Sequence, residues 1–513
     1  TNIFNQKLIK NSRKFIIFAH LNFNSRNRDI MKKFTEYKQL NLNAVADNIS
    51  EFWKTNETFK KSVELREGKP EYVFYEGPPS ANGMPGIHHV MARALKDIFC
   101  RYQTQNGKQV FRKAGWDTHG LPVELGVEKE LGITKEDIGK KITVEEYNQA
   151  CRNAVMRYTD VWNDLTEKIG YWVDLDNPYI TYEPKYMETV WWLLKQLYNK
   201  DLLYKGYTIQ PYSPKAGTGL SSHELNQPGT YRDVSDTTVV AQFSVKQLSE
   251  KASEKISNLE SQISNLSILA WTTTPWTLPS NTALAVGRDI EYVLVKTFNQ
   301  YTFEPINIIL ARPLLEKQFG KKFIEGTDED FTNYTSESKT IPYQILAEFT
   351  GEDLAGTTYE QLVPWFLPAE NAEKAFRVII GDFVTTEDGT GIVHIAPTFG
   401  ADDNRVAQEN GIPPMLVKDE NDNLVPLVDL TGRFLKGENV PELFSGKYIK
   451  NEYYDEGTAP EKSWDVELAI LLKTENKAFK VEKYVHSYPH CWRTDKPVLY
   501  YPLDSWFVKM TSV

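Results

Sequence analysis

Residues 72–107 read YVFYEGPPSANGMPGIHHVMARALKDIFCRYQTQNG, and this stretch decides the fold class. The first six residues are a short apolar run typical of a strand, and the Pro/Gly-rich PPSANGMPG after them is typical of a turn. From His88 onward, apolar side chains recur at helical spacing up to an Asn-Gly stop signal. A second expected strand begins at Val110. A strand, helix, strand unit predicts a parallel sheet, whose ligands bind beyond the carboxyl ends of its strands.

The composition is that of an ordinary globular protein. The chain has 513 residues, a hydrophobic fraction of 41% and a formal net charge of −10, which excludes collagenous, disordered and disulfide-scaffold proteins. At ~150 residues per domain, the length predicts roughly three domains. No run approaches the ~18 consecutive apolar residues of a membrane-spanning helix. Three widely spaced cysteines without a Cys-x-x-Cys pair favour a reducing compartment, so we expect the protein to be cytoplasmic.

Residues 1–30 differ from the rest of the chain, because they hold six basic side chains and one acidic one. An acid-poor, basic head is one feature of a transit peptide. The alternative, which we favour, is an unstructured extension, since Met31 opens an ordinary protein start, MKKFTEYKQLNL. The chain starts with Thr1 and stops at Val513 directly after an apolar run, so we expect it to be a fragment.

Helical patterns dominate the first 200 residues. Residues 36–65 show helical spacing, and Thr143 with Glu146 predicts a capping box that opens a helix ending at Gly170. The run METVWWLLKQLYNK predicts a further helix near residue 200. Cys151 lies on the apolar face of the capped helix and is expected to be a buried core thiol rather than a reactive one.

Between residues 232 and 480, short β-branched runs alternate with turn signals, which predicts a separate strand-rich domain. Inside it, residues 246–266 place apolar side chains at alternating three- and four-residue steps. Both a short coiled-coil arm and an amphipathic helix in a surface loop fit this spacing. Because three heptads barely qualify as a coiled coil, we favour the loop helix.

Two segments of the first half carry candidate ligand-binding groups. The Pro/Gly turn before His88 and His89 presents backbone N–H groups at a helix start, which suits phosphate, although capping imidazoles in any α/β fold give the same pattern. The segment GWDTHGLPVE places Asp117 and His119 after the second expected strand. A carboxylate there suits an ammonium group; the alternative is an Asp that only caps a turn.

Together the two segments resemble the class I aminoacyl-tRNA synthetases and, within them, the isoleucyl-tRNA synthetase family. The resemblance runs from about residue 36 to the end and includes SPKAGTGLSSHE, WTTTPWTLPSN, GTGIVHIAPTFGADD and SYPHCWR. Leucyl enzymes have Phe in place of His119, and valyl enzymes have a different segment there. The family signature His-x-Gly-His is altered here to Gly86-Ile87-His88-His89. Gly86 occupies the position of the signature's first histidine, and His88 that of its glycine. The sequence leaves open whether the His88 imidazole replaces the lost contact or whether the missing glycine obstructs the adenine.

The resemblance implies an α/β fold in which a partial Rossmann-like catalytic domain is interrupted by an inserted β-rich editing domain. The implied division is an extension over 1–30, a helical lead-in and first catalytic half over 31–210, the insertion over 211–480 and a return into the catalytic domain over 481–513. The family forms isoleucyl-adenylate from isoleucine and ATP with Mg²⁺ and then esterifies tRNA(Ile). Its lysine-rich loop and anticodon-binding domain are expected beyond Val513.

The resemblance also assigns site residues by position. His88 and His89 would contact ATP during adenylation. Pro78 and Asp117 would hold isoleucine, with Asp117 on its ammonium group. Trp506 would form a wall of the isoleucine side-chain pocket.

For the inserted domain, the resemblance implies hydrolysis of mischarged valyl-tRNA. Such editing is needed because a hydrophobic pocket rejects a substrate one methylene smaller by only ~1–3 kcal/mol. Asp403 would hold the amino group of the ester. Without the resemblance, the run Thr272–Thr274 would be typical of an ordinary strand. The hydrolytic pocket would be lined by His394, Thr272, Thr273 and Thr274. Phe399 stands where many bacterial members have histidine, which resembles the eukaryote-like branch and leaves open how water is activated.

His486, His490 and Cys491 have no fourth ligand close by in sequence, so no zinc is expected in this chain. The implied partners are tRNA(Ile), isoleucine and ATP, with no membrane and a monomeric protein; a local basic groove for tRNA is compatible with a net acidic chain. Three rivals stay open: a valyl or leucyl enzyme, a free-standing trans-editing hydrolase, and a tRNA-binding module without activity.

Overall fold

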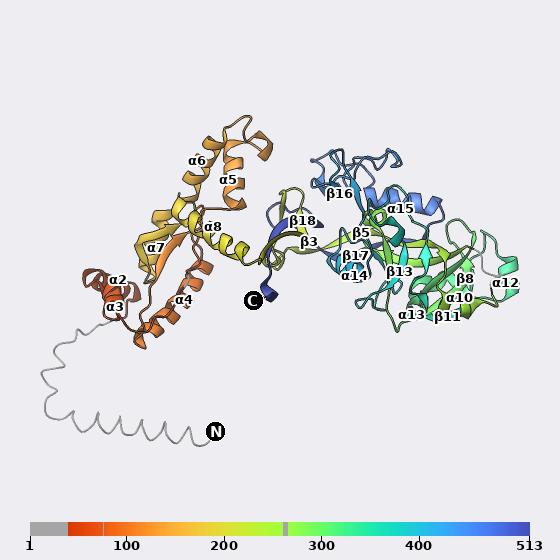
Figure 1. Cartoon of the computed structure of the whole chain (residues 1–513), viewed down its shortest axis with the longest axis horizontal. Coiled ribbons are helices and arrows are strands. Elements are labelled where there is room, and N and C mark those ends of the chain that lie inside the picture. The colour runs from red at the N-terminus through yellow and green to blue at the C-terminus, as the bar shows by residue number, and fades with distance from the viewer. Residues whose placement is uncertain (1–38, 75, 260–264, 513) are drawn as a thin grey trace, which may run out of the picture. The chain divides into compact units, whose positions relative to one another are not determined.

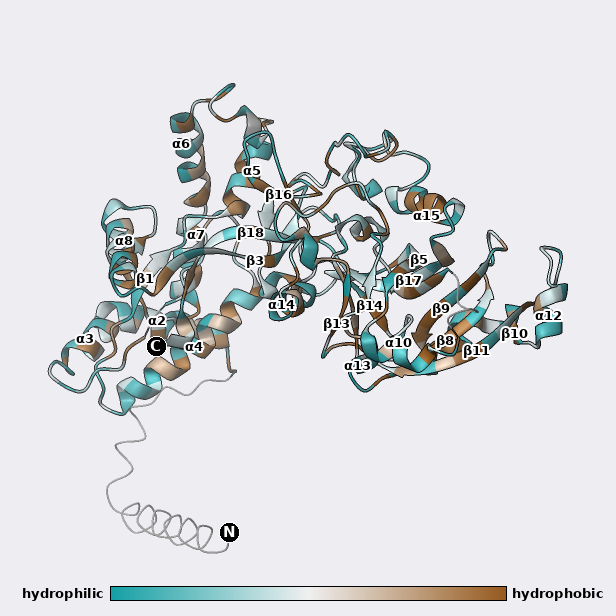
Figure 2. Cartoon of the chain, turned by 45° about the vertical axis from the view of Figure 1, so that its right-hand side comes forward, coloured by the Kyte–Doolittle hydropathy of each residue, from teal (hydrophilic) through white to brown (hydrophobic). Residues whose placement is uncertain are grey.

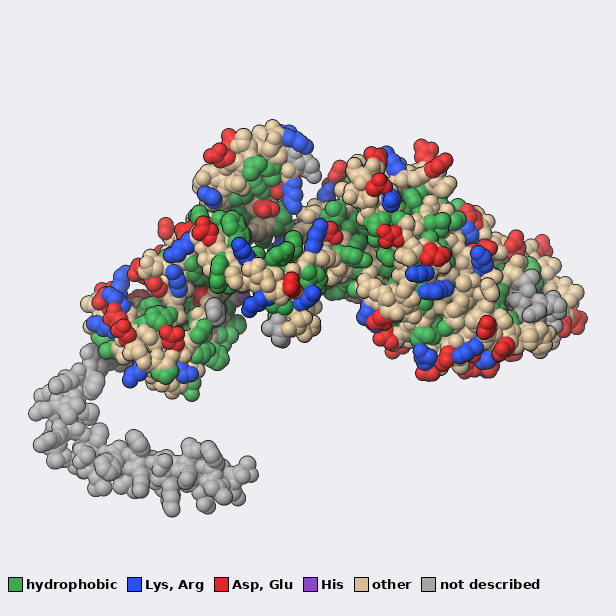
Figure 3. Space-filling model, in the orientation of Figure 1, with side chains coloured by type: hydrophobic (Ala, Val, Ile, Leu, Met, Phe, Trp, Pro, Cys, Tyr) green, Lys and Arg blue, Asp and Glu red, His purple; other side chains and the backbone are tan. Residues whose placement is uncertain are grey.

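The computed structural model describes residues 39–74, 76–259 and 265–512, so the expected extension over 1–30 lies outside the described residues. The chain divides into two compact units, Thr1–Lys200 and Asp201–Val513 (Figure 1). Charged side chains of both signs are interspersed over the face of the molecule drawn in Figure 3. Within the described residues, no helix combines the length and the apolar character that crossing a membrane requires.

The first unit is rich in helices and contains a short parallel strand pair. Its strands β1 (Lys113–Trp116) and β2 (Asp174–Ile180) run in the same direction, and the chain between them passes through helices. Such a crossover is the expected unit of an α/β fold. The helices are α2 (Leu42–Thr55), α3 (Thr58–Glu64), α4 (Ile87–Gln105), α5 (Leu121–Leu131), α6 (Val144–Val155), α7 (Thr159–Lys168) and α8 (Pro184–Asn199).

Several helix boundaries follow the predicted signals. The expected lead-in forms α2 and α3, and α4 ends at the Asn106 cap. The capping box is present, since the Glu146 N–H donates to Thr143 Oγ1 at 3.2 Å and the Thr143 N–H donates to Glu146 Oε2 at 3.0 Å. These bonds satisfy donors that the first turn of α6 leaves free.

The prediction of a strand over residues 72–77 is wrong, because the described residues of this range form no strand. Pairing is limited to one parallel bridge between Glu71 and Gln109, with the Tyr72 N–H donating to the Gln109 carbonyl at 2.9 Å. Pro78 and Pro79 follow without N–H groups, and a ladder cannot continue through them. The next strand, β1, also begins three residues later than expected.

The single helix expected from Thr143 to Gly170 is also wrong, because it breaks between α6 and α7. At the break the Tyr158 N–H donates to the Ala81 carbonyl at 3.1 Å, a bond to the Pro/Gly turn that a continuous helix would not allow. Cys151 on α6 is only partly buried.

An eleven-stranded sheet builds the second unit, as the strand-rich texture predicted. The strand order is β10-β11-β8-β9-β6-β14-β7-β13-β12-β5-β17, and β5 also pairs with β6, so the six strands from β6 to β5 close into a ring. The bounds are β5 (Tyr231–Gln247), β6 (Leu266–Thr272), β7 (Ala283–Val286), β8 (Glu291–Phe298), β9 (Pro305–Ala311), β10 (Phe323–Glu325), β11 (Ile341–Thr350), β12 (Thr358–Tyr359), β13 (Arg377–Ile380), β14 (Ile392–Ile395) and β17 (Ala478–Pro489).

Smaller elements complete the second unit. β3 (Leu203–Ser213) pairs antiparallel with β18 (Leu499–Val508) and with β4 (Thr218–Gly219). The strand pair β15 (Leu416–Lys418) and β16 (Leu424–Pro426) is separate from both sheets. The helices are α9 (Ser222–Leu225), α10 (Glu250–Ile256), α11 (Leu315–Phe319), α12 (Asp328–Asn333), α13 (Gly351–Leu354), α14 (Ala401–Glu409) and α15 (Trp464–Thr474).

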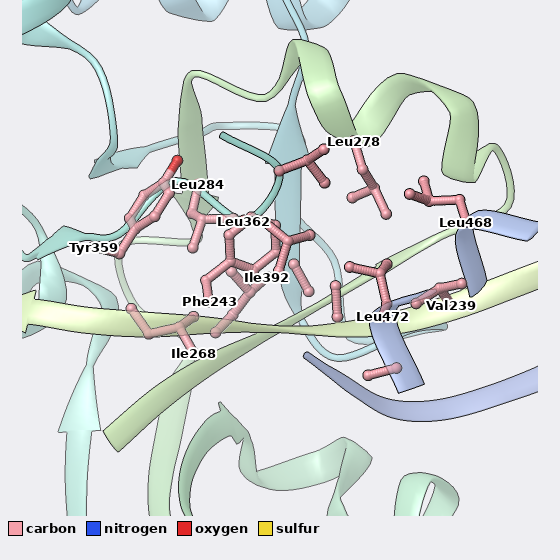
Figure 4. Packing of buried hydrophobic residues seen from close by; sticks show 14 of the residues in the cluster. Val239, Phe243, Ile268, Leu278, Leu284, Tyr359, Leu362, Ile392, Leu468 and Leu472 are labelled. Atoms are coloured by element: carbon pink, nitrogen blue, oxygen red, sulfur yellow. The ribbon is translucent and has the colours of Figure 1, made fainter. Parts of the chain in front are cut away.

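A large apolar core lies between the sheet and α15. All four residues of β7 are buried, which fits a strand covered on both faces. Leu468 and Leu472 of α15 pack in the same cluster as Phe243, Ile268 and Leu278 (Figure 4). Strands such as β8 and β9 carry much of this hydrophobic surface (Figure 2). Because each such side chain contributes roughly 1.5–3 kcal/mol on full burial, this cluster is a large favourable term in the stability of the unit.

The coiled-coil arm expected over 246–266 is not found in the described residues, and the favoured amphipathic helix is present only in part, as the short α10 packed on the core. β5 continues to Gln247, α10 is only seven residues long, and β6 begins at Leu266. Ala252 and Ile256 of α10 are buried in the core.

Candidate functional site

The Pro/Gly turn of the first unit leads directly into α4. The Gly86 N–H donates to His89 Nδ1 at 2.9 Å, so the imidazole caps the helix start. Burial, followed by the charges of His88 and Arg93, lowers the pKa of His89 below its usual value. A neutral His89 that accepts at Nδ1 carries its proton on Nε2, which leaves a donor for a ligand at the helix N-terminus.

The His88 side chain lies beside Gly86, which replaces the first histidine of the family signature. A Cβ added to Gly86 would lie 2.9 Å from His88 Cε1 and 3.0 Å from His88 Nδ1. The imidazole of His88 therefore lies where a side chain at position 86 would begin, and its ring centre is 3.8 Å from that of His89.

The turn and the segment GWDTHGLPVE come together in the first unit. The Asp117 N–H donates to the Pro79 carbonyl at 3.0 Å, next to Pro78. Asp117 directly follows the carboxyl end of β1, is exposed, and its Oδ1 accepts only a long bond, 3.3 Å, from the His119 N–H. The carboxylate thus stands at the edge of a parallel sheet where ligands bind.

Trp506 belongs to the second unit, on β18, and its side chain is 61% exposed. Its role as a wall of the isoleucine pocket stays a prediction.

The second unit contains a pocket of ≈ 360 Å³ at the carboxyl end of β6. All five residues predicted for the editing site line it, although they are up to 131 positions apart in sequence. They are Thr272, Thr273, Thr274, His394 and Asp403. Phe399, Thr277 and the segment 388–393 complete most of the wall. The structure thus brings together one imidazole, several hydroxyls and two carboxylates, those of Asp403 and Asp388.

His394 of β14 is held on both ring nitrogens. Thr277 Oγ1 lies 2.9 Å from Nε2, and the Asn281 amide lies 3.4 Å from Nδ1. The Tyr359 hydroxyl donates to Asn281 Oδ1 at 2.8 Å and extends the chain of bonds. Thr277 and Asn281 were not singled out by the sequence, although both lie in the motif WTTTPWTLPSN.

The surroundings of His394 keep it neutral. Burial lowers its pKa to about 4. Because both nitrogens already have protein partners, the ring is suited to fixing the Thr277 turn and not to taking a proton from water.

Asp403 lies in the first turn of α14, where its Oδ2 accepts from the Ala396 N–H at 2.8 Å. Burial raises the pKa of this carboxyl to about 7; the Ala396 bond acts against the shift, and the nearby Asp402 adds to it. No lysine or arginine among the described residues contributes to this pKa. A carboxylate that lacks a cation in such a pocket is suited to bind one.

Asp403→Asn is expected to stabilise the protein more at pH 8 than at pH 5. The carboxyl has an ordinary pKa in the unfolded chain and a raised one in the folded chain, so its stability cost begins near pH 4 and is complete above about pH 7. The free energy of unfolding should therefore rise by about 2–4 kcal/mol at pH 8 and by clearly less at pH 5. Urea unfolding at both pH values measures this, and an equal gain at both would contradict the assignment.

The threonine turn is compact. Its first residue, Thr272, ends β6 and accepts at Oγ1 from the Thr274 N–H at 3.0 Å. The short 3₁₀ helix η3 (Pro275–Ser280) follows, and Thr277 Oγ1 donates back to the Thr274 carbonyl at 2.8 Å. These bonds hold the turn against the wall that contains His394.

The backbone at Gly391 in the pocket wall leaves no room for a side chain. Its φ is +70°, and an added Cβ would lie 2.3 Å from the Ala311 Cβ. Gly391→Ala is expected to lower the free energy of unfolding by at least about 3 kcal/mol, because left-handed strain and overlap add. Gly229→Ala is the matched control, since Gly229 has φ +82° with no atom within 4 Å and tests the strain alone. Equal losses in urea unfolding would refute the packing argument.

The histidines near the end of the chain, which were considered as metal ligands, bind protein groups. His486 Nε2 lies 3.1 Å from Asp236 Oδ2, His490 Nδ1 lies 3.0 Å from the Tyr488 carbonyl, and Cys491 is buried. In the part of the chain that the structure describes, no three His, Cys, Asp or Glu side chains are grouped as metal ligands.

The chain is similar to bacterial isoleucine-tRNA ligases over most of its length. Isoleucine-tRNA ligase of Bacteroides fragilis is 58% identical over 494 residues, which cover 94% of this chain and 42% of the relative. The ligase of Cytophaga hutchinsonii is 60% identical with the same coverage. The chain thus spans less than half the length of these relatives. Both are bacterial, and they give no support to the eukaryote-like branch suggested by Phe399.

A crystal structure described as GlLeuRS-CP1 covers 48% of this chain and 99% of its own, at 16% identity and a TM-score of 0.31, too distant to carry an argument. The family model "tRNA synthetases class I (I, L, M and V)" matches residues 48–513. The match covers both units with the α/β architecture described above, and the chain therefore belongs to the class I tRNA synthetases.

Proposed function

We propose that the protein is an isoleucine-tRNA ligase that also edits its product. It activates isoleucine with ATP, taken together with Mg²⁺, and transfers it to tRNA(Ile); its second unit hydrolyses valyl-tRNA(Ile). The relatives that are 56–60% identical over 94% of the chain support the ligase. The observation that carries the editing proposal is the pocket that gathers Asp403, His394 and the threonine turn.

In the first unit, the turn and the β1 edge supply groups for the two substrates. The N-terminus of α4 and the Nε2–H of His89 favour the triphosphate of ATP, on which negative charge grows as the isoleucine carboxylate attacks the α-phosphate and pyrophosphate leaves. The exposed Asp117 is placed to pair with the ammonium group of isoleucine. The Asp117 N–H donates to the Pro79 carbonyl and so joins the segment of Asp117 to the Pro/Gly turn that precedes α4. A reaction between ATP and an amino acid requires that the two binding segments lie close together.

In the second unit, the mischarged ester presents an ammonium group beside the bond to be cut. Asp403 pairs with that group and so fixes the carbonyl in the pocket. The hydroxyls of the threonine turn hold water and the ribose oxygens. His394 is neutral, and both of its ring nitrogens already have hydrogen-bond partners. Hydrolysis therefore relies on the orientation of water and ester and not on an imidazole base.

The test is deacylation of valyl-tRNA(Ile) by the 513-residue chain, with isoleucyl-tRNA(Ile) as the competing substrate. We expect faster hydrolysis of the valyl ester. Absence of valyl-tRNA hydrolysis would refute the editing proposal. Isoleucine-dependent exchange of pyrophosphate into ATP by the full-length protein tests the ligase.

We infer that the protein is a cytoplasmic monomer whose partners are tRNA(Ile), isoleucine and ATP. The inserted editing domain is placed at 211–480, with the catalytic domain on either side, as the family resemblance implies.

A further inference from the structure

A buried carboxylate outside the pocket contacts the turn that builds it. Asp465 lies in the first turn of α15, and its Oδ1 accepts from the Trp276 N–H at 2.8 Å. The two residues are 189 positions apart in sequence. Asp465 does not line the pocket, so the chemistry proposed above makes no use of it.

The Trp276 N–H is a donor that its own segment leaves free. η3 begins with Pro275, which has no N–H, and the preceding Thr274 makes no side-chain cap. The start of a helix leaves several N–H groups without partners, and an unpaired buried one destabilises the conformation. Asp465 therefore caps η3 from a different element.

The capped turn carries pocket residues on both sides of the contact. Thr274 precedes Trp276 by two positions, and Thr277 follows it directly and bonds His394. The Trp276 ring packs edge-to-face on Phe399, with ring centres 4.9 Å apart, and Phe399 is itself part of the pocket wall. A shift of Trp276 would thus move the hydroxyls and the wall together.

Lys450 balances the buried charge. Its Nζ lies 3.7 Å from Asp465 Oδ2 and 3.2 Å from Asp236 Oδ2, and the side chains of Lys450 and Asp465 are only 7% and 5% exposed. His486 contacts the same oxygen of Asp236, and Tyr488 lies beneath the Lys450 ammonium group. Burial raises the pKa of Asp465, while Lys450 and the Trp276 N–H oppose the rise.

We propose that Asp465, with Lys450 as its counter-ion, is a positioning residue for the editing pocket. It holds the turn Thr274–Thr277 in the geometry in which the hydroxyls of that turn meet the ester. The inference rests on the proposed editing function for its effect on rate, but not for its effect on the turn.

The experiment compares Asp465→Ala, which removes the acceptor, with Asp465→Asn, which retains an oxygen for the Trp276 N–H. Two quantities are measured: amide hydrogen exchange in the peptide 272–280, and kcat and KM for deacylation of valyl-tRNA(Ile). For Asp465→Ala we expect exchange to become at least ~10-fold faster and kcat to fall at least ~10-fold with little change in KM, since small displacements of positioned groups cost this much. Asp465→Asn should stay near the wild type in both.

Ser249→Ala is the matched control, because Ser249 caps α10 in the same unit, accepts from the Ala252 N–H at 3.1 Å and does not line the pocket. It should leave the peptide 272–280 and kcat unchanged. The proposal is overturned if Asp465→Ala leaves both quantities at wild-type values, or if Asp465→Asn is as impaired as the alanine variant. A wild-type chain that hydrolyses no valyl-tRNA refutes the proposed function instead, and hydrogen exchange then still decides whether Asp465 holds the turn.

Discussion

Asp403→Ala is expected to abolish hydrolysis of valyl-tRNA(Ile), with a loss of at least ~10²-fold in kcat/KM. The pocket is lined by two carboxylates, and since Asp388 already contacts Lys317 and Tyr484, we assign Asp403 to the ammonium group of the ester. In the proposed mechanism, loss of this carboxylate would free the ester to rotate, so that a water bound to the threonine hydroxyls would no longer be aligned with the carbonyl. The measurement is the rate of deacylation of pre-charged valyl-tRNA(Ile).

Two further variants separate the role of Asp403 from damage to the fold. Asp402→Ala removes the neighbouring, exposed carboxylate and should leave deacylation unchanged. Asp403→Asn retains an acceptor for the Ala396 N–H and should keep the fold while losing deacylation. Adenylation by the full-length protein should stay near normal in all three variants, because neither Asp402 nor Asp403 is among the groups that we assign to it. Deacylation that survives in Asp403→Ala would remove this residue from its assigned role.

His88→Gly is expected to lower isoleucine-dependent pyrophosphate exchange by the full-length protein ~10²-fold or more, the scale of losing one preorganised donor in the transition state. The reason is that the His88 imidazole occupies the space in which a side chain of residue 86 would begin. Its Cε1 and Nδ1 atoms would lie 2.9 and 3.0 Å from a Cβ added to Gly86. We expect that ring to bind ATP as the first histidine of the family signature does in other members. Wild-type exchange by the variant would show that His88 is only tolerated in the turn.

A swap of positions sharpens this test. Gly86→His alone should be inactive, because the new side chain overlaps the His88 ring. Gly86→His combined with His88→Gly restores the order His-Ile-Gly-His and should recover exchange to within ~10-fold of the wild type, since one donor is exchanged for another. A double variant as inactive as His88→Gly would contradict the substitution of one imidazole for the other.

Local signals in the sequence determined much of this protein. The capping box at Thr143, the helix of residues 87–105 and the strand-rich texture after residue 232 depend on neighbouring residues, and the structure has them close to where they were expected. The family was also readable, because whole motifs such as GWDTHGLPVE identify it without any structure.

Tertiary contacts decided the rest. The helix that starts after Thr143 ends at Val155, and beyond it the Tyr158 N–H donates to the distant Ala81 carbonyl. Burial of Ala252 and Ile256 places α10 on the core and not in a surface loop. The pairing of His394 with Thr277 and Asn281, and the cap that Asp465 places on η3, join residues more than a hundred positions apart. A local pattern carries no information on such partners, because only the closure of the strands of the sheet brings these segments within bonding distance.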